Sequence, residues 1–273
     1  MERFEQVLQQ GYRFNMESYF GKGWDLFKKG AGGLIGYTIL VFFASIVVSF
    51  IPFVGLLNGF LQAAFIAGIF VYCRQLSQKN ENFNQFFEGF SSFGQIAIYV
   101  LLRFLFTLPL IALIFTVIFP FELLSDLILG DIDPEFIAEE IALGIQENFG
   151  TIMLFYLIII AGFVYIYISY AFTLPLIVDA KLDFWQAMET SRRVIGKQFF
   201  MFLLMFLLVV IVGGVAIGVT CGLGAFVVFP YLHCIIYAAY DEILQPQKDN
   251  IASEISSFGE KEDDVNTESE DTE

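Results

Sequence analysis

The chain has 273 residues, of which 57% are hydrophobic, and its mean hydropathy of +0.71 with 34 phenylalanines excludes a single water-soluble domain. The formal net charge is −15, and the 14 basic residues occur only in short clusters. The basic face that nucleic-acid binding requires is therefore missing, and no nucleic-acid partner is expected.

The first 33 residues are charged and amphipathic, without the apolar core and small-residue cleavage site of a secretory signal peptide. We expect residues 1–33 to form an N-terminal cytoplasmic segment and residues 34–244 to form a transmembrane domain. Residues 245–273 are rich in Ser, Glu and Asp and bury too little apolar surface to fold, so we expect a disordered acidic cytoplasmic tail.

Three windows of the chain contain no Lys or Arg: 30–73, 104–180 and 198–247. Each window holds two apolar runs of roughly the 20 residues that cross a hydrocarbon layer. Because loops kept in the cytoplasm are enriched in Lys and Arg, the windows predict three hairpins that cross the bilayer and return, with both termini cytoplasmic. The predicted fold is an all-α polytopic bundle with spans near 34–52, 56–73, 97–119, 151–171, 198–219 and 222–240.

A short aromatic motif precedes each hairpin. Residues 20–27 and 86–93 both read F-x-x-G-[WF]-x-x-F, and residues 184–189 repeat 83–88 more weakly as F-x-Q-x-x-E. We interpret these segments as three copies of one unit, an amphipathic interfacial helix followed by a transmembrane hairpin.

The third copy shows the physics of this unit best. Asp183 is suited to cap a helix start, and Phe184, Met188, Ser191 and Ile195 recur on one side. The helix should lie along the inner leaflet, with tryptophan rings and basic groups at the level of the lipid headgroups. The side chains predicted to contact lipid are Trp24, Lys28, Lys29, Trp185, Arg192, Arg193 and Lys197.

The middle window contains a long external loop, 120–150, which carries eight carboxylates. The sequence Asp-Pro-Glu at 133–135 predicts a helix start, and isoleucines follow at 137, 141 and 145. Two interpretations stay open: a lid or cation-attracting vestibule, or a solvated loop that shields the mouth of the hairpin.

Polar groups within the predicted spans define a second candidate site. Arg103 is the one deep charged residue, and no carboxylate lies at comparable depth, although a proton- or sodium-coupled carrier normally keeps one. Snorkelling to lipid phosphates, or bonding to carbonyls and tyrosines, is the favoured role of Arg103. Polar groups of this kind line a pocket or hold helices together. The predicted intramembrane set is Arg103, Asn58, Gln62, Tyr167 and Tyr170.

Small residues also form a pattern in the fifth span and the turn after it. Gly214, Gly218 and Gly222 repeat at four-residue spacing, which allows a neighbouring helix to approach closely. We expect this contact inside the monomer rather than between two molecules.

The residues that usually carry catalysis or bind metals are scarce. His233 is the single histidine, and Cys73, Cys221 and Cys234 lack metal-ligand spacing and read as buried thiols. No H-E-x-x-H, P-loop or G-x-S-x-G motif occurs. The sequence therefore predicts no catalytic residue, no metal and no cofactor, and it disfavours an enzyme.

Several segments resemble a known family. Residues 19–29 (YFGKGWDLFKK), 35–38 and 50–55, and above all 174–193 (LPLIVDAKLDFWQAMETSRR), are similar to an uncharacterised family of bacterial six-helix integral membrane proteins. That family is in turn similar to the membrane domain that precedes the catalytic domain of some glycerophosphodiester phosphodiesterases. The resemblance covers residues 17–244 and implies this architecture and a bacterial cytoplasmic (inner) membrane. Only an acidic tail follows residue 240, so phosphodiesterase activity is not expected, and the long loop 120–150 departs from the short connection expected for the family.

These patterns lead to a functional prediction. A non-enzymatic membrane scaffold or adaptor, whose interfacial helices contact inner-leaflet lipid, fits the repeated aromatic and basic segments beside spans without buried acids. The alternative is a carrier or permease for an apolar or lipid-like solute. Membrane lipids are the one partner indicated; no protein partner or oligomeric state follows from the sequence.

Overall fold

The computed structural model describes residues 7, 9–50, 58–78, 83–118, 146 and 149–244. The described residues form helices and no strands, which confirms the predicted all-α class. Among the described residues, six helical segments are long and apolar enough to cross a membrane, as expected for a multi-pass membrane protein. In chain order, the elements are α2 (Met16–Ser49), α3 (Asn58–Ser77), the 3₁₀ helix η2 (Phe83–Ser92), α4 (Phe93–Ile118), α7 (Phe149–Ser169), α8 (Thr173–Val178), α9 (Phe184–Gly196), α10 (Phe199–Val219) and α11 (Ala225–Leu244).

The first predicted boundary differs from the structure. The N-terminal segment and the first span are one helix of 34 residues, α2, which the Asn15 side chain caps by accepting from the Ser18 N–H. Its only non-helical residue is Gly30 (φ −111°, ψ 19°), so the segment before the span is joined to it by a kink. Composition changes at residue 33, but no turn residue after Gly30 interrupts the backbone.

Two other elements begin earlier or end later than predicted. The third span starts at Phe93, directly after η2, and α3 continues past Arg74 to Ser77. The helix predicted after residue 133 and the tail from 245 lie outside the described residues.

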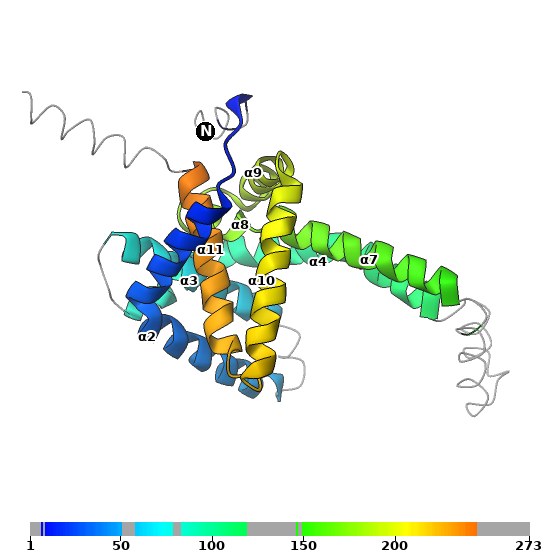
Figure 1. The fold of residues 1–273 in the computed structure, drawn as a ribbon, viewed down its shortest axis with the longest axis horizontal. Coiled ribbons are helices and arrows are strands. Elements are labelled where there is room, and N and C mark those ends of the chain that lie inside the picture. Colours follow the sequence, from blue (N-terminus) through cyan, green and yellow to red (C-terminus); the bar gives the residue numbers. More distant parts are fainter. Residues whose placement is uncertain are drawn as a thin grey trace, which may run out of the picture.

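The most extensive packing between two helices joins the first and last apolar segments. α2 packs along α11, while α3 packs against η2 and α2, and α10 packs against α11. α4 and α7 pack against each other and extend away from the rest (Figure 1). The N-terminus, α9 and the end of α11 lie together at the top of Figure 1, and the turn from α10 to α11 lies at the bottom.

Close packing in the core depends on aromatic rings. The buried Phe86 ring of η2 stacks between Tyr37 of α2 and Tyr72 of α3, with 4.1 Å between centroids on each side. Three elements are thereby joined through one ring, and each offset aromatic pair adds about 0.5–1.5 kcal/mol beyond its buried area.

The glycine of the repeated motif lies against a helix backbone in both strong copies. A Cβ atom on Gly23 would stand 2.9 Å from Cα of Ile235 in α11, and one on Gly89 would stand 2.5 Å from the backbone nitrogen of Gly68 in α3. Since backbone atoms cannot swing aside, a side chain at either position would force the helices apart.

The fourth apolar segment is broken near its C-terminal end. α7 ends at Ser169, and the six-residue helix α8 follows, with all its residues buried and in contact with α3, α4, α9 and η2. The Ser191 hydroxyl of α9 accepts from the Phe172 N–H (3.1 Å) and donates to the Ser169 carbonyl (2.8 Å), so one side chain satisfies two backbone groups at the break.

The glycine stripe does not make the predicted contact inside the monomer. No described atom outside the local backbone lies within 4 Å of a Cβ built on Gly214, Gly218 or Gly222. The adjacent Gly213 makes the close approach instead, and its Cβ would stand 2.6 Å from a methyl group of Val228 in α11. The helix rotation that buries Gly213 turns Gly214 and Gly218 outward, so the expectation was wrong.

Candidate functional site

α9 has one buried and one exposed side. Asp183 caps its start by accepting from the Trp185 N–H (3.2 Å), as the sequence predicted. Its apolar side packs into the bundle, while the Trp185 ring is 54% exposed on the other side. The buried residues of this helix are Ala187, Met188, Ser191, Val194 and Ile195.

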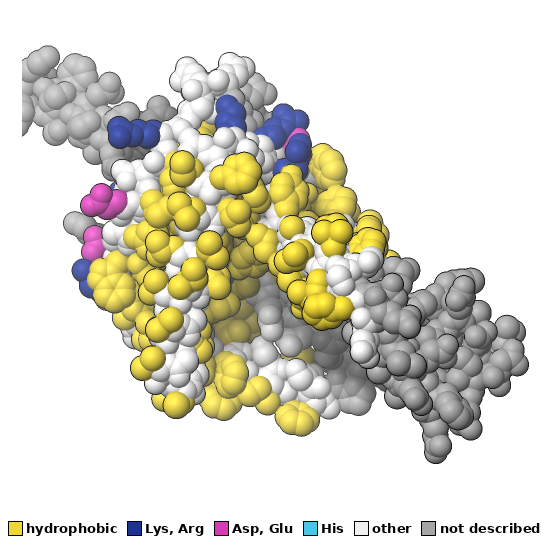
Figure 2. Space-filling view, turned by 45° about the vertical axis from the view of Figure 1, so that its right-hand side comes forward, with side chains coloured by type: hydrophobic (Ala, Val, Ile, Leu, Met, Phe, Trp, Pro, Cys, Tyr) yellow, Lys and Arg dark blue, Asp and Glu magenta, His cyan; other side chains and the backbone are white. Residues whose placement is uncertain are grey.

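Basic side chains gather at the end of the molecule that carries α9. In Figure 2 they follow the upper edge of the view, above a broad apolar surface, with a smaller group of charges at the left edge. In water this apolar surface would be costly, whereas the hydrocarbon core of a membrane covers it without cost.

The two arginines of α9 share one carboxylate. Glu189 accepts from Arg192 (2.7 and 2.9 Å) and from Nε of Arg193 (2.6 Å). Hydrogen bonds from Arg192, then from Arg193, lower the pKa of the Glu189 carboxyl from 4.5 to about 2, and the carboxylate raises the pKa of Arg192. The cluster carries one net positive charge, and the Arg192 and Arg193 side chains are 45% and 59% exposed. Lys197, just after α9, donates to the Val7 carbonyl at 3.5 Å.

A cavity of about 180 Å³ lies beside this cluster. Trp185, Met188, Glu189 and Arg192 of α9 form one wall, and Phe106 of α4 with Tyr170 forms the other. Tyr170 was predicted in the intramembrane set, but the structure places it beside the residues of α9.

The first-copy candidates lie on the part of α2 that precedes the kink. The Trp24 ring is 44% exposed, stacks on Phe27 (5.6 Å) and meets the edge of Tyr231 in α11 (5.5 Å). Lys28 pairs with Asp25 at 3.1 Å, and Lys29 is exposed. These side chains are not brought into the α9 cavity; they form a second aromatic and basic group against α11.

The predicted intramembrane set is divided between three places. Arg103 of α4 donates to the Tyr99 hydroxyl (3.3 Å), and its guanidinium lies 5.3 Å from the centroid of the Tyr167 ring in α7. Asn58 and Gln62 lie in the first two turns of α3, and Gln62 lines a separate cavity to which neither Arg103 nor the tyrosines of α7 contribute. Among the described residues, these five side chains therefore do not line one common pocket.

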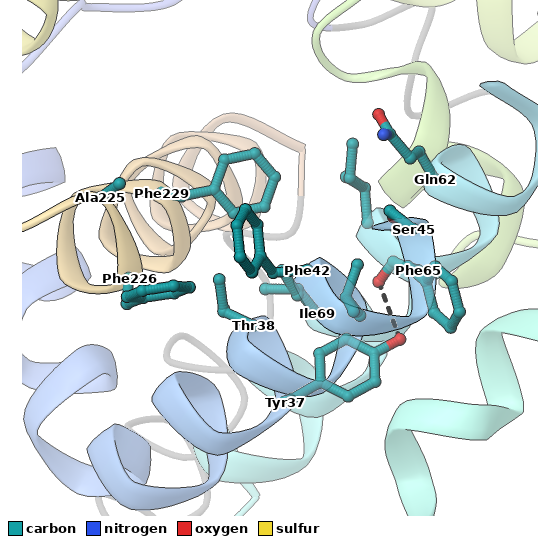
Figure 3. A pocket seen from close by; sticks show the side chains of 12 residues that line it. Tyr37, Thr38, Phe42, Ser45, Gln62, Phe65, Ile69, Ala225, Phe226 and Phe229 are labelled. Atoms are coloured by element: carbon teal, nitrogen blue, oxygen red, sulfur yellow. Dashed lines mark hydrogen bonds between the residues drawn. The ribbon is translucent and has the colours of Figure 1, made fainter. Parts of the chain in front are cut away.

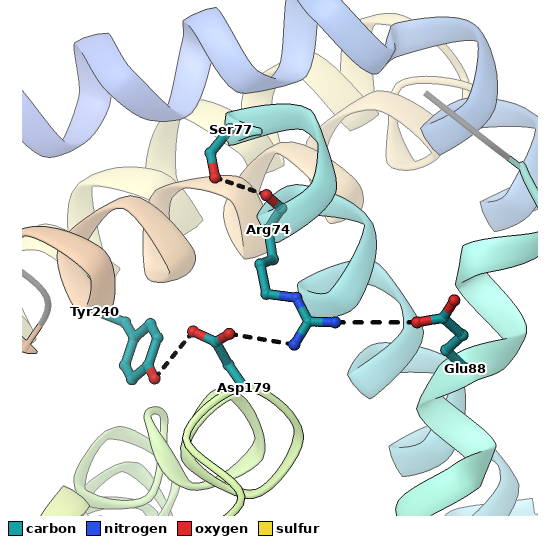
Figure 4. A network of polar contacts seen from close by, with 5 residues as sticks. All are labelled: Arg74, Ser77, Glu88, Asp179 and Tyr240. Atoms are coloured by element: carbon teal, nitrogen blue, oxygen red, sulfur yellow. Dashed lines mark hydrogen bonds and ion pairs between the residues drawn. The ribbon is translucent and has the colours of Figure 1, made fainter. Parts of the chain in front are cut away.

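A polar network that the sequence reasoning missed lies at the C-terminal end of α3 (Figure 4). Arg74 donates to Asp179 (3.3 Å), Asp179 also accepts from the Tyr240 hydroxyl (3.2 Å), and Glu88 of η2 lies 3.9 Å from the same guanidinium. Asp179 follows α8 and its side chain is 9% exposed, so the network joins α3, η2, α8 and α11. Two features of the sequence could have indicated this pair. Arg74 directly follows the basic-free window 30–73, and Asp179 is the acidic residue that ends the segment 174–179.

The cysteine and histidine side chains are not arranged as a catalytic or metal-binding group among the described residues. Cys73 and Cys234 are buried with 3.6 Å between their sulfur atoms, and the His233 ring nitrogen Nδ1 lies 2.8 Å from the Phe229 carbonyl. Cys221 is exposed in the turn from α10 to α11, so the expectation of three buried thiols was wrong. Within the described part of the chain, no group of three His, Cys, Asp or Glu side chains is placed to hold a metal ion.

No protein-family model, curated protein or solved structure matches this chain.

Proposed function

We propose that the chain is a multi-pass protein of a bacterial cytoplasmic membrane that acts as a non-enzymatic scaffold or adaptor, with both termini in the cytoplasm. In this proposal, α2–α3, α4–α7 and α10–α11 cross the bilayer as three hairpins, and α9 binds anionic lipid at the inner leaflet. The observation that carries the proposal is the two-sided α9, whose exposed Trp185, Arg192 and Arg193 stand at the basic end of an otherwise apolar surface.

The packing of the three segments before the hairpins supports an internal repeat. Gly23 of the first copy lies on α11, Gly89 of the second lies on α3, and α9 contacts α7. The second and third segments thus each pack against the second helix of the preceding hairpin. The first segment has no preceding hairpin and packs against the second helix of the last one.

The Glu189 cluster gives the lipid site a specific chemistry. A lipid phosphate that binds Arg192 and Arg193 competes with one carboxylate, so the intramolecular pairs set a threshold for lipid binding. A phosphate bound here would lie beside the Trp185 ring and the cavity that Tyr170 and Phe106 close.

Lipid retention tests the proposal. The protein is extracted in mild detergent, and the anionic phospholipid that stays bound is counted by native mass spectrometry. The triple variant Arg192→Ala, Arg193→Ala, Lys197→Ala should lose bound anionic lipid, whereas Glu189→Gln should retain more, because it frees both guanidinium groups. Lys22→Ala, which removes a basic group paired with Glu242 outside α9, should change little. Equal retention in the triple variant and Glu189→Gln would refute the lipid role of α9.

The second candidate function is a carrier or permease for an apolar or lipid-like solute. The placement of Gln62 on an apolar cavity between α2, α3 and α11 favours it. A carrier should speed the exchange of a fluorescent phospholipid between the leaflets of proteoliposomes, as read by an external quencher; a rate equal to that of protein-free vesicles argues against transport.

A further inference from the structure

A second cavity, of about 280 Å³, lies between α2, α3 and α11 (Figure 3), and none of its lining residues belongs to α9. Its volume is near the lower end of the roughly 300–1,000 Å³ range of small-molecule sites. The lining residues are Tyr37, Thr38, Val41, Phe42 and Ser45 of α2, Gln62, Phe65, Ile66 and Ile69 of α3, and Ala225, Phe226 and Phe229 of α11.

The lining contains no charged side chain, and two of its four polar side chains are already bonded within the protein. The Tyr37 hydroxyl donates to the Phe65 carbonyl (3.1 Å), and the Thr38 hydroxyl donates to the Leu34 carbonyl (2.8 Å). The Ser45 hydroxyl and the Gln62 amide make no hydrogen bond to another described residue, so these two groups are left to meet a polar part of an occupant. The cavity thus takes a largely apolar molecule with few polar atoms.

The Ser45 and Gln62 side chains lie toward one end of the cavity. Ser45 is one turn from the end of α2, and Gln62 is one turn from the start of α3, whereas Tyr37 and Ile69 lie about two turns deeper in their helices. The lining of α2 extends over eight residue steps, or about 12 Å at ~1.5 Å per residue. The cavity is therefore elongated. Ser45 and Gln62 form its polar end near the helix termini, whereas the hydroxyls at the end toward the middle of the spans are already bonded to backbone carbonyls.

The cavity borders on the surface that a bilayer would cover. Phe42 and Phe229, two of its lining residues, are 48% and 40% exposed, and the neighbouring Phe43 and Val47 are 60% and 63% exposed. Helices of this length and hydropathy place these rings in hydrocarbon, so an occupant enters sideways from the lipid rather than from water.

We infer that this cavity binds one acyl chain of a membrane phospholipid, whose ester and glycerol oxygens lie at Gln62 and Ser45. Lipid tails are as apolar as the lining, so burial itself contributes little, and retention comes from van der Waals packing against the aromatic walls together with the hydrogen bonds at the polar end. A single-chain site suits the elongated shape, and the gradient of polarity fixes the direction in which the chain enters. This site is independent of the α9 proposal, because the two involve different residues and opposite ends of the spans.

Photo-crosslinking in the membrane tests the inference. The full chain is reconstituted into vesicles of phosphatidylcholine and phosphatidylglycerol that contain a phospholipid with a diazirine in its acyl chain, and labelled peptides are mapped by mass spectrometry. Adducts should concentrate on the cavity segments of α2, α3 and α11. Ala225→Phe, which places a ring in the cavity, should remove most of this labelling. Val215→Phe, at a 63% exposed position on α10, adds the same bulk outside the cavity and should leave the pattern unchanged.

Two further variants keep the test decisive. If Ala225→Phe does not elute as a folded monodisperse species, Ile66→Trp fills the cavity from α3 instead. Gln62→Leu keeps the volume but removes the amide, and it should lower labelling by the phospholipid probe more than labelling by a diazirine alkane. Labelling spread evenly over the exposed apolar surface of all spans, and unchanged by both filling variants, would overturn the inference, whether or not α9 binds lipid.

Discussion

The Ser191 hydroxyl bonds the backbone at the break between α7 and α8. It is fully buried and bonds both the Phe172 N–H and the Ser169 carbonyl. Ser191→Ala should lower the free energy of unfolding by about 1–3 kcal/mol, because it leaves two buried backbone groups unpaired. The thermal midpoint of the detergent-solubilised protein measures this effect.

Thr190→Ala provides the matched control. It removes a hydroxyl from the adjacent, partly exposed position of α9, which makes no hydrogen bond at the break, and should change the midpoint little. Equal losses in the two variants would show that Ser191 does not support the break.

The Glu189 cluster predicts a specific pH dependence. The folded pKa of Glu189 is lowered from 4.5 to about 2, so its contribution to stability is complete above pH 4.5 and is lost as the pH falls toward 2. The difference in thermal midpoint between the native chain and Glu189→Gln should be constant from pH 7 to 5 and then shrink. Partly exposed pairs contribute about 0.2–1 kcal/mol each, so the shift is small. A difference that is unchanged down to pH 3, or that grows on acidification, would contradict the pairing.

Residue-level features were predictable where they depend on near neighbours in the sequence. The Asp183 cap follows from spacing within one turn, and the structure contains it. The bond from Arg74 to Asp179 links residues 105 positions apart and depends on how α8 enters the bundle, so spacing gave no access to it. The separation of Arg103 and Gln62 into different sites was unpredictable for the same reason. A polar residue in a span is expected to need a partner, but the sequence does not show which helix supplies that partner.

At the scale of elements, the glycines of the repeated motif carry a prediction. Gly23→Ala and Gly89→Ala should each cost about 1–3 kcal/mol of stability, because the new methyl group meets backbone atoms of α11 or α3. Gly21→Ala, within the first motif, and Gly94→Ala, directly after the second, are the controls, because no described atom outside the local backbone lies within 4 Å of the new Cβ. Thermal midpoints of the four variants should separate into two pairs. Similar midpoints for Gly21→Ala and Gly23→Ala would mean that the motif glycine has no packing role.

The six spans were predictable as elements because their length and hydropathy are local properties. Their interruptions were less so. The kink at Gly30 and the break after Ser169 depend on residues of other elements. Gly30 packs against Leu76 and Tyr72 of α3, and the Ser169 carbonyl accepts a hydrogen bond from Ser191 of α9. The outward rotation of Gly214 and Gly218 is likewise decided by the packing of Gly213 on Val228, which a four-residue spacing does not reveal.

At the scale of the whole molecule, the proposed topology places the α9 cluster and the acyl-chain cavity at opposite sides of the membrane. α9 precedes α10 at the end that also holds the N-terminus, whereas the cavity is lined by the end of α2 and the starts of α3 and α11. Lipid contacts in the two leaflets would then be independent, and both depend on which end faces the cytoplasm.

The native cysteines offer a direct test of this orientation. Cys221, exposed in the turn from α10 to α11, should react with a membrane-impermeant maleimide in intact spheroplasts, while the buried Cys73 and Cys234 stay unlabelled. Labelling should disappear in Cys221→Ser, and in that background Glu189→Cys on α9 should react only after the membrane is permeabilised. The reverse pattern, with position 189 labelled in intact cells and Cys221 protected, would invert the topology and move the basic end of the molecule outside the cell.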